Sequence, residues 1–426
     1  MKYFLSWFFI TLTALIFWSV LVIWSTENGW FHSAKAPDEN PEHFMAWSKG
    51  EIKNGFKGNL SYILIENGEE SYTYNQSMDD SIEIDSVFQV SSLGKWVAAF
   101  GVMTLVQSGE IELDKPISNY LTRWQLPESK FDNSAVTVRR LLSHTAGLTD
   151  GLGHSGFAPG EEVQKLEEHL TQASDADEGV SGKVKVGVLP GSEFIYSGGG
   201  YNLLQLLVEE VSKVPFEQFM KKSVFEPLGM NNSSYFVEYS DPKLAKQYDG
   251  QGRVAIHYRY TSLAATGLYS TARDLSIFVN AHFPGSNGEQ AGRGVLSEDI
   301  LKIMRQPHAS KLGADIWGLG TILYAPLEDG GYIIGHDGQA SPAINSSARL
   351  NPKTGDAIII IESGSKTFAS KIAGEWTFWQ SGKIDFTIFP VDQMLNTLIY
   401  GVIFILFVSI LLAWHIRKNR ITKLHD

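Results

Sequence analysis

The sequence contains no cysteine. Disulfide bonds, a thiol nucleophile, cysteine-ligated metals and a lipidated N-terminal cysteine are therefore excluded. Positive charge is also scarce, because 47 acidic side chains outnumber 35 basic ones and give a formal net charge of −12. No basic stripe follows the chain, so we expect no binding of nucleic acid. The 11 histidines lack a metal-ligand spacing such as H-E-x-x-H, so we expect no metal and no other cofactor.

Two long hydrophobic runs lie at the ends of the chain. Residues 3–24 carry no charge over 22 residues, and residues 395–414 carry none over 20. Each run is long enough to cross a lipid bilayer as a helix. Basic residues follow the second run and mark the cytoplasmic side of a cell membrane: Arg417, Lys418, Arg420 and Lys423. We therefore expect an uncleaved anchor at 1–36, an extracytoplasmic domain at 37–388, and a membrane helix with a cytoplasmic tail at 389–426.

A cleaved signal peptide is the alternative for the first run. The apolar core of a signal peptide is usually about 7–15 residues long, which is shorter than this run. Ala34-Lys35-Ala36 resembles a cleavage site but lies far beyond the end of the run. Helices buried in a protein core are another explanation for both runs. Their terminal positions, lengths and flanking charges argue against it.

A third apolar run, at residues 96–106, predicts a helix that is buried on all sides. Gly109 follows it, where a left-handed C-cap favours glycine. Ser92 and Lys95 precede it as an S-x-x-K motif, which places both side chains on one face at the start of the helix. A serine hydroxyl needs a nearby base to act as a nucleophile, and a half-buried lysine can lose its proton near neutral pH. The helix N-terminus would also stabilise an oxyanion.

The motif alone is weak evidence for catalysis. It also occurs at Ser240 and Ser363, but only Ser92 heads an apolar helix. Taken alone, S-x-x-K more often represents a serine at a helix start and a solvated lysine. The rest of the chain must therefore decide between the two interpretations.

The sequence predicts strands near both ends of the outer domain and helices between them. Residues 62–68 and 71–74 indicate two strands joined by an Asn-Gly turn. Further strands are expected at 317–324, 332–335, 346–350 and 357–362, and helices at 44–52, 138–143, 161–171, 201–211, 272–283 and 367–380. We expect the helix at 161–171 to be exposed and the glycines 198–200 to precede a helix. This order favours an α/β (α+β) fold, with an antiparallel sheet from both chain ends, flanking helices and an inserted, mostly helical region.

Six short motifs follow one another along the chain. They are Ser92-Leu93-Gly94-Lys95, Leu141-Leu142-Ser143-His144-Thr145-Ala146-Gly147-Leu148, Pro190-Gly191 before Tyr196-Ser197, Pro227-Leu228-Gly229-Met230, Gly267-Leu268-Tyr269-Ser270-Thr271 and Gly335-His336-Asp337-Gly338. Their order and spacing resemble the class C β-lactamase-related serine hydrolases, which include D,D-peptidases, penicillin-binding proteins, β-lactamases and esterases. The resemblance covers roughly residues 45–380. Each motif is weak alone, but six in order favour a catalytic role for Ser92.

The resemblance implies the serine β-lactamase or penicillin-binding-protein fold and a role for each motif. Ser92 would be the acyl-accepting nucleophile, activated by Lys95. Tyr196 would act with Lys95 as general base and then as acid to the leaving group, provided that Lys95 lowers the tyrosine pKa from its ordinary value of about 10. The backbone N–H groups of Ser92 and Gln339 would form the oxyanion hole. The substrate would lie against His336, Gly338 and Gly198.

Two positions depart from the family pattern. Gly198 stands where the Y-x-N motif has asparagine, so the amide that would hold a substrate amide is missing. His336-Asp337-Gly338 stands where the family often has K-T-G, and a neutral histidine would hold a substrate carboxylate less firmly than lysine. A literal Lys353-Thr354-Gly355 lies in a predicted turn and is rejected for this role. Both departures argue against an efficient β-lactamase and favour the esterase and peptidase branches.

Together these features predict a membrane-anchored serine hydrolase that forms an acyl-enzyme and cleaves an ester or amide bond in a small molecule or peptide. They leave the protein partners unknown. Two alternatives stay open. One is a binding module without turnover, such as a penicillin-type sensor or a pseudoenzyme, for which Gly198 leaves room. The other is a structural membrane protein whose anchors matter more than its pocket. We expect His144 to order its own turn rather than to catalyse, and Asp337 to be a turn residue.

Overall fold

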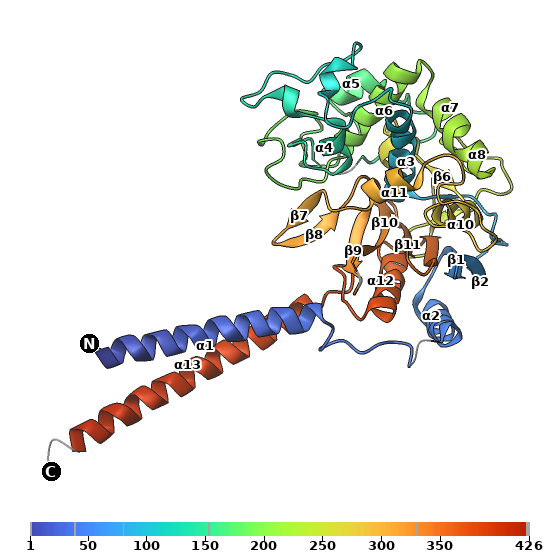
Figure 1. Cartoon of the computed structure of the whole chain (residues 1–426). Coiled ribbons are helices and arrows are strands. Elements are labelled where there is room, and N and C mark those ends of the chain that lie inside the picture. Colours follow the sequence, from blue (N-terminus) through green and yellow to red (C-terminus); the bar gives the residue numbers. More distant parts are fainter. Residues whose placement is uncertain (1, 38–39, 80, 152–153, 329, 423–426) are drawn as a thin grey trace.

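The computed structural model describes residues 2–37, 40–79, 81–151, 154–328 and 330–422, so Lys423 of the basic tail lies outside it. Two long helices, α1 (Lys2–Glu27) and α13 (Val391–Thr422), extend side by side from the rest of the protein (Figure 1). Both are long and apolar enough to cross a membrane. Thr11 Oγ1 lies 2.5 Å from Ser409 Oγ, and Trp7 donates a hydrogen bond to the Ser409 carbonyl. The two terminal hydrophobic runs therefore form a helical pair.

One eight-stranded antiparallel sheet organises the domain, in the order β2-β1-β12-β11-β10-β9-β8-β7. Its strands are β1 (Asn59–Glu66), β2 (Glu69–Gln76), β7 (Ala309–Lys311), β8 (Ala314–Trp317), β9 (Ile322–Pro326), β10 (Tyr332–Ala340), β11 (Ile344–Asn351) and β12 (Asp356–Ser363). β1 opens the domain and pairs with β12, near its end, with Tyr62 opposite Ile360. The predicted sheet from both chain ends is confirmed.

The strand β12 shows how the sheet is covered on both faces. Ile358 and Ile360 pack with α2 (Pro41–Gly55) and α12 (Phe368–Ser381), whereas Ile359 and Ile361 pack into the main core around α3 (Gly94–Gln107). Successive side chains of a strand point to opposite faces, so a strand covered on both sides needs a continuous apolar run. Each buried isoleucine contributes roughly 1.5–3 kcal/mol to folding.

The helical region lies at the end of the domain opposite the α1–α13 pair (Figure 1). The helices after α3 are α4 (Val138–Leu142), α5 (Leu166–Thr171), α6 (Gly198–Ser212), α7 (Phe216–Met220), α8 (Glu226–Leu228), α9 (Leu263–Thr266), α10 (Ala272–Asn280) and α11 (Glu298–Met304). Single turns of helix are η1 (Ser91–Leu93), η2 (Ile117–Asn119), η3 (Asn133–Ala135) and η4 (Lys221–Phe225). Short strand pairs are β3 (Phe88–Gln89) with β6 (Tyr269–Ser270), and β4 (Gln247–Tyr248) with β5 (Val254–Ala255). The helix α3 is buried all round, as predicted, and Gly109 beyond it has φ 79°.

Two predicted helices differ from those observed. The helix expected at 161–171 begins only at Leu166, and it is not exposed, because Leu166, His169 and Leu170 are buried. The three glycines expected before a helix instead form the first turn of α6, capped by the Ser197 side chain. A Cβ atom at Gly199 would lie 2.4 Å from Val184, so neighbouring side chains leave no room for a larger residue.

Two predictions in the region of the sheet, one of a strand and one of a turn, were also wrong. The strand expected at 317–324 is instead two strands, β8 and β9, separated by a turn. Gly320 in this turn has φ 80°, and a Cβ atom at this position would lie 2.1 Å from Ala99 on α3. Asp337 is not a turn residue but a member of β10, where it accepts a hydrogen bond from Tyr324 and pairs with the buried Arg349 at 3.1 Å. Arg349 also pairs with the buried Asp385. These contacts come from distant segments that local patterns do not reveal.

Candidate active site

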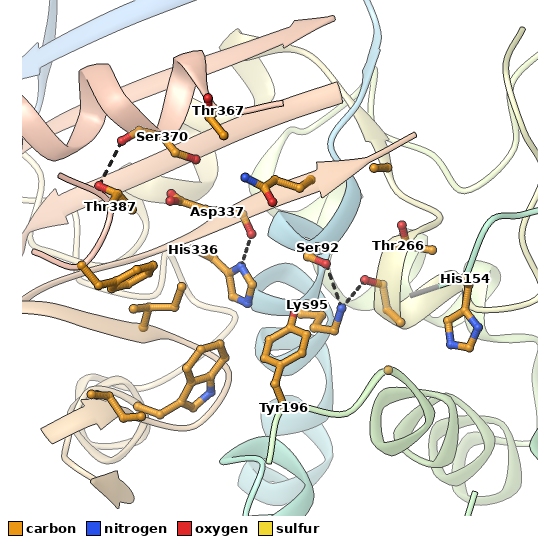
Figure 2. A pocket seen from close by; sticks show the side chains of 18 of the residues that line it. Ser92, Lys95, His154, Tyr196, Thr266, His336, Asp337, Thr367, Ser370 and Thr387 are labelled. Carbon is orange, nitrogen blue, oxygen red and sulfur yellow. Dashed lines mark hydrogen bonds between the residues drawn. The ribbon is translucent and has the colours of Figure 1, made fainter. Parts of the chain in front are cut away.

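Ser92 lies in the turn η1, directly ahead of α3, and its side chain is partly accessible (Figure 2). The preceding residue, Ser91, has φ 50°, which is uncommon outside glycine. Its hydroxyl donates a hydrogen bond of 2.7 Å to the Gln339 carbonyl on β10. This bond helps to fix η1 against the sheet, so the unusual backbone holds Ser92 at the junction of helix and sheet.

Lys95 lies in the first turn of α3 and is only 3% exposed. Its Nζ donates hydrogen bonds of 3.0 Å to Ser92 Oγ and 2.7 Å to the Ala265 carbonyl. Burial lowers the pKa of Lys95 to about 7, although the nearby Asp150 carboxylate acts in the opposite direction. A buried amine favours its neutral form because the charged form loses its hydration. Lys95 can therefore accept a proton near neutral pH.

Tyr196 lies opposite Lys95, whose Nζ is 4.9 Å from the centre of the tyrosine ring. The hydroxyl of Tyr196 is hydrogen-bonded to Ser92, so all three predicted catalytic side chains meet. Burial raises the pKa of Tyr196 well above its ordinary value, and only the hydrogen bond to Ser92 opposes the rise. This differs from the expectation that Lys95 would lower it. In this environment Tyr196 stays protonated and Lys95 is the better base.

Two residues that the sequence did not single out for the site hold Tyr196 in place. The ring of His144 stacks on the tyrosine at 4.2 Å, and its Nδ1 accepts a hydrogen bond from the Ser197 backbone. Asp150 accepts hydrogen bonds from the Ser197 hydroxyl at 2.5 Å and from the Gly199 amide at 2.8 Å. Both residues fix the segment that leads into α6, so His144 does more than order its own turn.

His336 and Gly338 belong to β10, and His336 lies beside Ser92 (Figure 2). The Nδ1 of His336 is 2.6 Å from the Asp337 carbonyl, which can only accept, so Nδ1 carries the proton and Nε2 a lone pair. Burial, together with the charge of Lys95, lowers the pKa of His336 to about 3. Neutral His336 cannot attract a substrate carboxylate by charge. At Gly338 a Cβ would lie 2.2 Å from the Val90 carbonyl, so glycine lets β10 approach the Ser92 turn.

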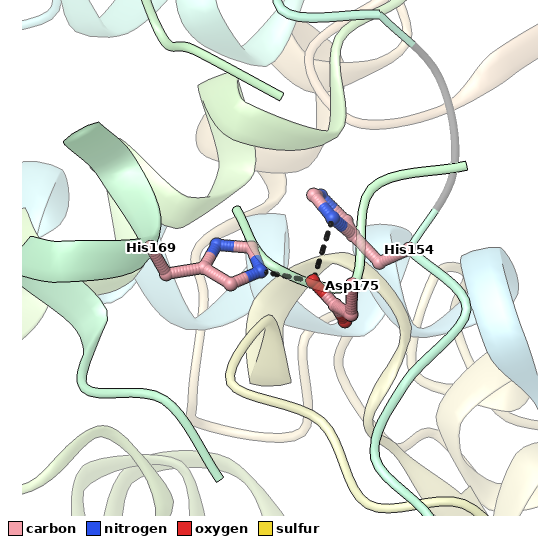
Figure 3. Close-up of side chains that lie close together, drawn as sticks. All are labelled: His154, His169 and Asp175. Atoms are coloured by element: carbon pink, nitrogen blue, oxygen red, sulfur yellow. Dashed lines mark hydrogen bonds and ion pairs between the residues drawn. The ribbon is translucent and has the colours of Figure 1, made fainter. Parts of the chain in front are cut away.

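The opposite side of the site carries a second group of polar side chains, His154, His169 and Asp175 (Figure 3). Asp175 Oδ1 lies 2.6 Å from His169 Nε2 and 3.6 Å from His154 Nδ1. Asn202 donates to Nδ1 of His169, which leaves the Nε2 proton for Asp175. The ligand-type atoms of the three residues lie within 4.8 Å of one another. These hydrogen bonds account for His169 and Asp175 without a cation, and the expected lack of a metal stays a prediction.

These residues enclose a cavity of about 930 Å³. Its lining includes six of the seven predicted site residues and one residue that the sequence did not indicate: Ser92, Lys95, Tyr196, Gly198, His336, Gln339 and His154. The seventh, Gly338, does not line the cavity and instead packs against the Ser92 turn. Lys353 of the rejected K-T-G sequence lies in the β11–β12 turn and does not line it. His154 follows a stretch without periodicity, so its place in the cavity could be found only from the fold.

A family model described as Beta-lactamase matches residues 58–375. Penicillin-binding protein 4* of Bacillus subtilis (strain 168) is 30% identical over 167 residues, which span 39% of this chain but only 34% of that protein. Penicillin-binding protein 4 of Amycolatopsis lactamdurans is 27% identical over 304 residues, 67% of this chain and 74% of that protein. The octameric penicillin-binding protein homologue from Pyrococcus abyssi has a TM-score of 0.63 at 24% identity, covering 80% of this chain and 77% of that one.

The sheet covered by helices on both faces and the site beside it are those of a serine hydrolase. The chain belongs to the β-lactamase family, a family of serine hydrolases. The family and enzyme class predicted from the six motifs are thereby confirmed.

Proposed function

We propose that this protein is a membrane-anchored hydrolase that cleaves an ester or amide bond through a covalent acyl-enzyme on Ser92. The observation that carries the proposal is the meeting of Ser92 with Lys95 Nζ at 3.0 Å, in a site where burial lowers the pKa of the lysine to about 7, so that about half of it is neutral at pH 7. A nucleophile with a base in hydrogen-bond reach is the arrangement that activates serine.

The first half of the reaction forms the acyl-enzyme. Neutral Lys95 takes the proton of Ser92 as Oγ attacks the substrate carbonyl carbon. The oxyanion would be held by the backbone N–H groups of Ser92 and Gln339, and losing one such donor typically slows a reaction about 10²–10³-fold. When the tetrahedral intermediate collapses, the bond to the leaving oxygen or nitrogen breaks. Protonated Tyr196, which is hydrogen-bonded to Ser92, is placed to give the leaving oxygen or nitrogen a proton.

The second half returns the enzyme to its starting state. Water attacks the acyl ester, the bond to Ser92 Oγ breaks, and the carboxylic acid product leaves. Lys95 passes the proton that it received to Tyr196, which replaces the proton given to the leaving group, and neutral Lys95 then moves a proton from the attacking water to Ser92 Oγ. The neutral His336 and the missing side chain at Gly198 argue against efficient β-lactam hydrolysis. A lysine and an asparagine at these two positions would hold the polar groups of a β-lactam, and the residues present here do not replace them.

Intact-protein mass spectrometry of the full chain in detergent tests the nucleophile. A fluorophosphonate should add once to the wild-type chain and not to Ser92→Ala. Ser363→Ala, a matched control in another S-x-x-K sequence, should be labelled like the wild type. A penicillin and a nitrophenyl ester, run beside the fluorophosphonate, report which acyl donors the site accepts. Full labelling of Ser92→Ala would overturn the assignment, and an adduct that forms but never hydrolyses would favour a sensor.

We further propose that α1 and α13 cross the membrane as a pair and hold the catalytic domain on the extracytoplasmic side. The contacts between the two helices support the pairing, and the basic residues from Arg417 to Lys423 support the orientation. The natural absence of cysteine makes the test simple. Lys353→Cys, on an exposed turn, should react with an impermeant maleimide in intact cells, whereas a cysteine added to the C-terminal tail should react only after permeabilisation. The reverse pattern would place the domain in the cytoplasm.

A further inference from the structure

The cavity wall beside Ser92 is built by His154 where the family pattern has an asparagine side chain. A Cβ atom at Gly198 would lie only 2.9 Å from His154 Nε2. The imidazole of His154 therefore occupies the space into which a side chain at position 198 would project. The side chain is 8% exposed, its Nδ1 faces Asp175 at 3.6 Å, and its Nε2 has no hydrogen-bond partner among the described residues. A buried, unsatisfied ring in a cavity wall is a group that a ligand can complete.

The segment around Asp175 holds His154 in position. His154 forms a β-bridge with Ala176, and the next two amides, of Ser155 and Gly156, donate to the Asp175 carbonyl at 2.8 Å and to its Oδ2 at 3.2 Å. Asp175 Oδ1 faces His154 Nδ1 at 3.6 Å (Figure 3). A carboxylate can only accept, so it favours the tautomer with the proton on Nδ1. The lone pair of His154 then lies on Nε2, next to Gly198.

The cavity consequently offers hydrogen-bond acceptors on both sides of the nucleophile. His154 and His336 lie on opposite sides of Ser92 in Figure 2, and each presents an Nε2 without a partner in the described part of the chain. Asp177 also lines the cavity on the His154 side. An environment of lone pairs and negative charge suits a substrate that donates hydrogen bonds.

We propose that His154 replaces the side chain missing at Gly198 and binds an N–H donor, an amine or amide nitrogen next to the reacting carbonyl of the substrate. This inference rests on the proposed acyl transfer to Ser92. It makes amino-acid or peptide esters and amides better substrates than acyl donors that lack the nitrogen. Asp175 is a positioning residue that acts through His154.

Paired substrates test the inference with the full chain in detergent. The methyl esters of D- and L-phenylalanine carry the amino group, and methyl 3-phenylpropanoate is the same ester without it. In the wild type, kcat/KM should be higher for at least one of the two phenylalanine esters than for methyl 3-phenylpropanoate. His154→Ala should lower that kcat/KM roughly 10- to 100-fold, the effect of losing one hydrogen bond to a charged or polar group, and leave hydrolysis of the propanoate within about twofold. His308→Ala, a histidine that does not line the cavity, should change neither rate.

A substitution at position 198 gives a second test that does not depend on tolerance of His154→Ala. Gly198→Asn alone should slow hydrolysis of both kinds of ester, because its side chain meets the His154 ring. Combining it with His154→Ala should restore hydrolysis of the propanoate, so that the two substitutions are strongly non-additive. Equal losses on both esters in His154→Ala, or additive effects at 154 and 198, would overturn the inference while leaving Ser92 chemistry intact. If no ester is hydrolysed in a Ser92-dependent manner, the proposed function falls and this inference falls with it.

Discussion

Replacing Lys95 with methionine should make the protein more stable at neutral pH and less stable at alkaline pH. The side chains have similar lengths, but methionine has no proton to lose. The pKa of Lys95 falls from its ordinary value of 10.5 to about 7 on burial. Keeping this amine in the folded chain therefore costs on the order of 4–5 kcal/mol below pH 7, since one pKa unit corresponds to about 1.4 kcal/mol.

The sign follows from proton binding. Between pH 7 and 10.5 the unfolded chain binds a proton at Lys95 that the folded chain lacks, so the cost shrinks as the pH rises and vanishes above 10.5. Methionine removes this cost but leaves the buried Ala265 carbonyl without its hydrogen bond, a loss of about 1–3 kcal/mol at every pH. The net effect of Lys95→Met is a gain of roughly 1–4 kcal/mol at pH 6.5 and a loss of roughly 1–3 kcal/mol at pH 10.5.

Urea unfolding of the full chain in detergent, followed by tryptophan fluorescence at both pH values, measures this difference. Titrating groups that do not interact with Lys95 cancel when variant and wild type are compared at the same pH. Lys353→Met, on an exposed turn, is the matched control and should show no dependence on pH. An effect of Lys95→Met that is the same at both pH values would refute the reasoning, because it would mean that burial does not shift the pKa of the lysine.

Three further outcomes are expected. The rate of fluorophosphonate labelling should rise with pH through about 7, because Lys95 becomes neutral there. The variant Lys95→Arg keeps its proton and should be labelled roughly 10²–10⁴-fold more slowly. A labelling rate that does not change with pH in the wild type would argue against lysine as the base. Arg349→Met should lower the free energy of unfolding by roughly 3–5 kcal/mol, because the carboxylates of Asp337 and Asp385 lose their buried cation. Thermal unfolding should show a lower melting temperature. Gly320→Ala should lower the free energy of unfolding by roughly 1–3 kcal/mol in the same assay. Gly313→Ala should have a smaller effect, because Gly313 has a similar positive φ but open space around it. Equal effects would show that backbone strain alone, and not the contact with α3, matters.

The features that were predicted correctly depend on neighbouring residues in the sequence. The Asn67-Gly68 turn has φ 50° and 83°, values that Asn and Gly tolerate, and it joins β1 and β2 as expected. The helix expected from residue 272 begins there as α10, where Thr271 accepts a hydrogen bond from the Asp274 amide. Ser92 and Lys95 meet because they are one helical turn apart.

The features that were missed depend on contacts between distant segments. The helical start of α6 at glycine 198 is set by Val184 and His154, which approach it from another loop, and no pattern within the glycines shows this. The same is true of Asp337, whose role is fixed by Arg349 on the neighbouring strand. The shift of the Tyr196 pKa was also out of reach, since it depends on how deeply the finished fold buries the ring.

The pairing of β1 with β12 has a consequence for biosynthesis. β1 leaves the ribosome early, but its partner β12 is made only after almost the entire domain has been translated. Until then one edge of the β1–β2 hairpin is open to association with other chains. Contacts that are so distant in sequence also slow folding. A chain truncated before β12 should therefore aggregate rather than form a smaller active enzyme, and early attachment of α1 to a membrane would keep nascent copies apart while the last strand is made.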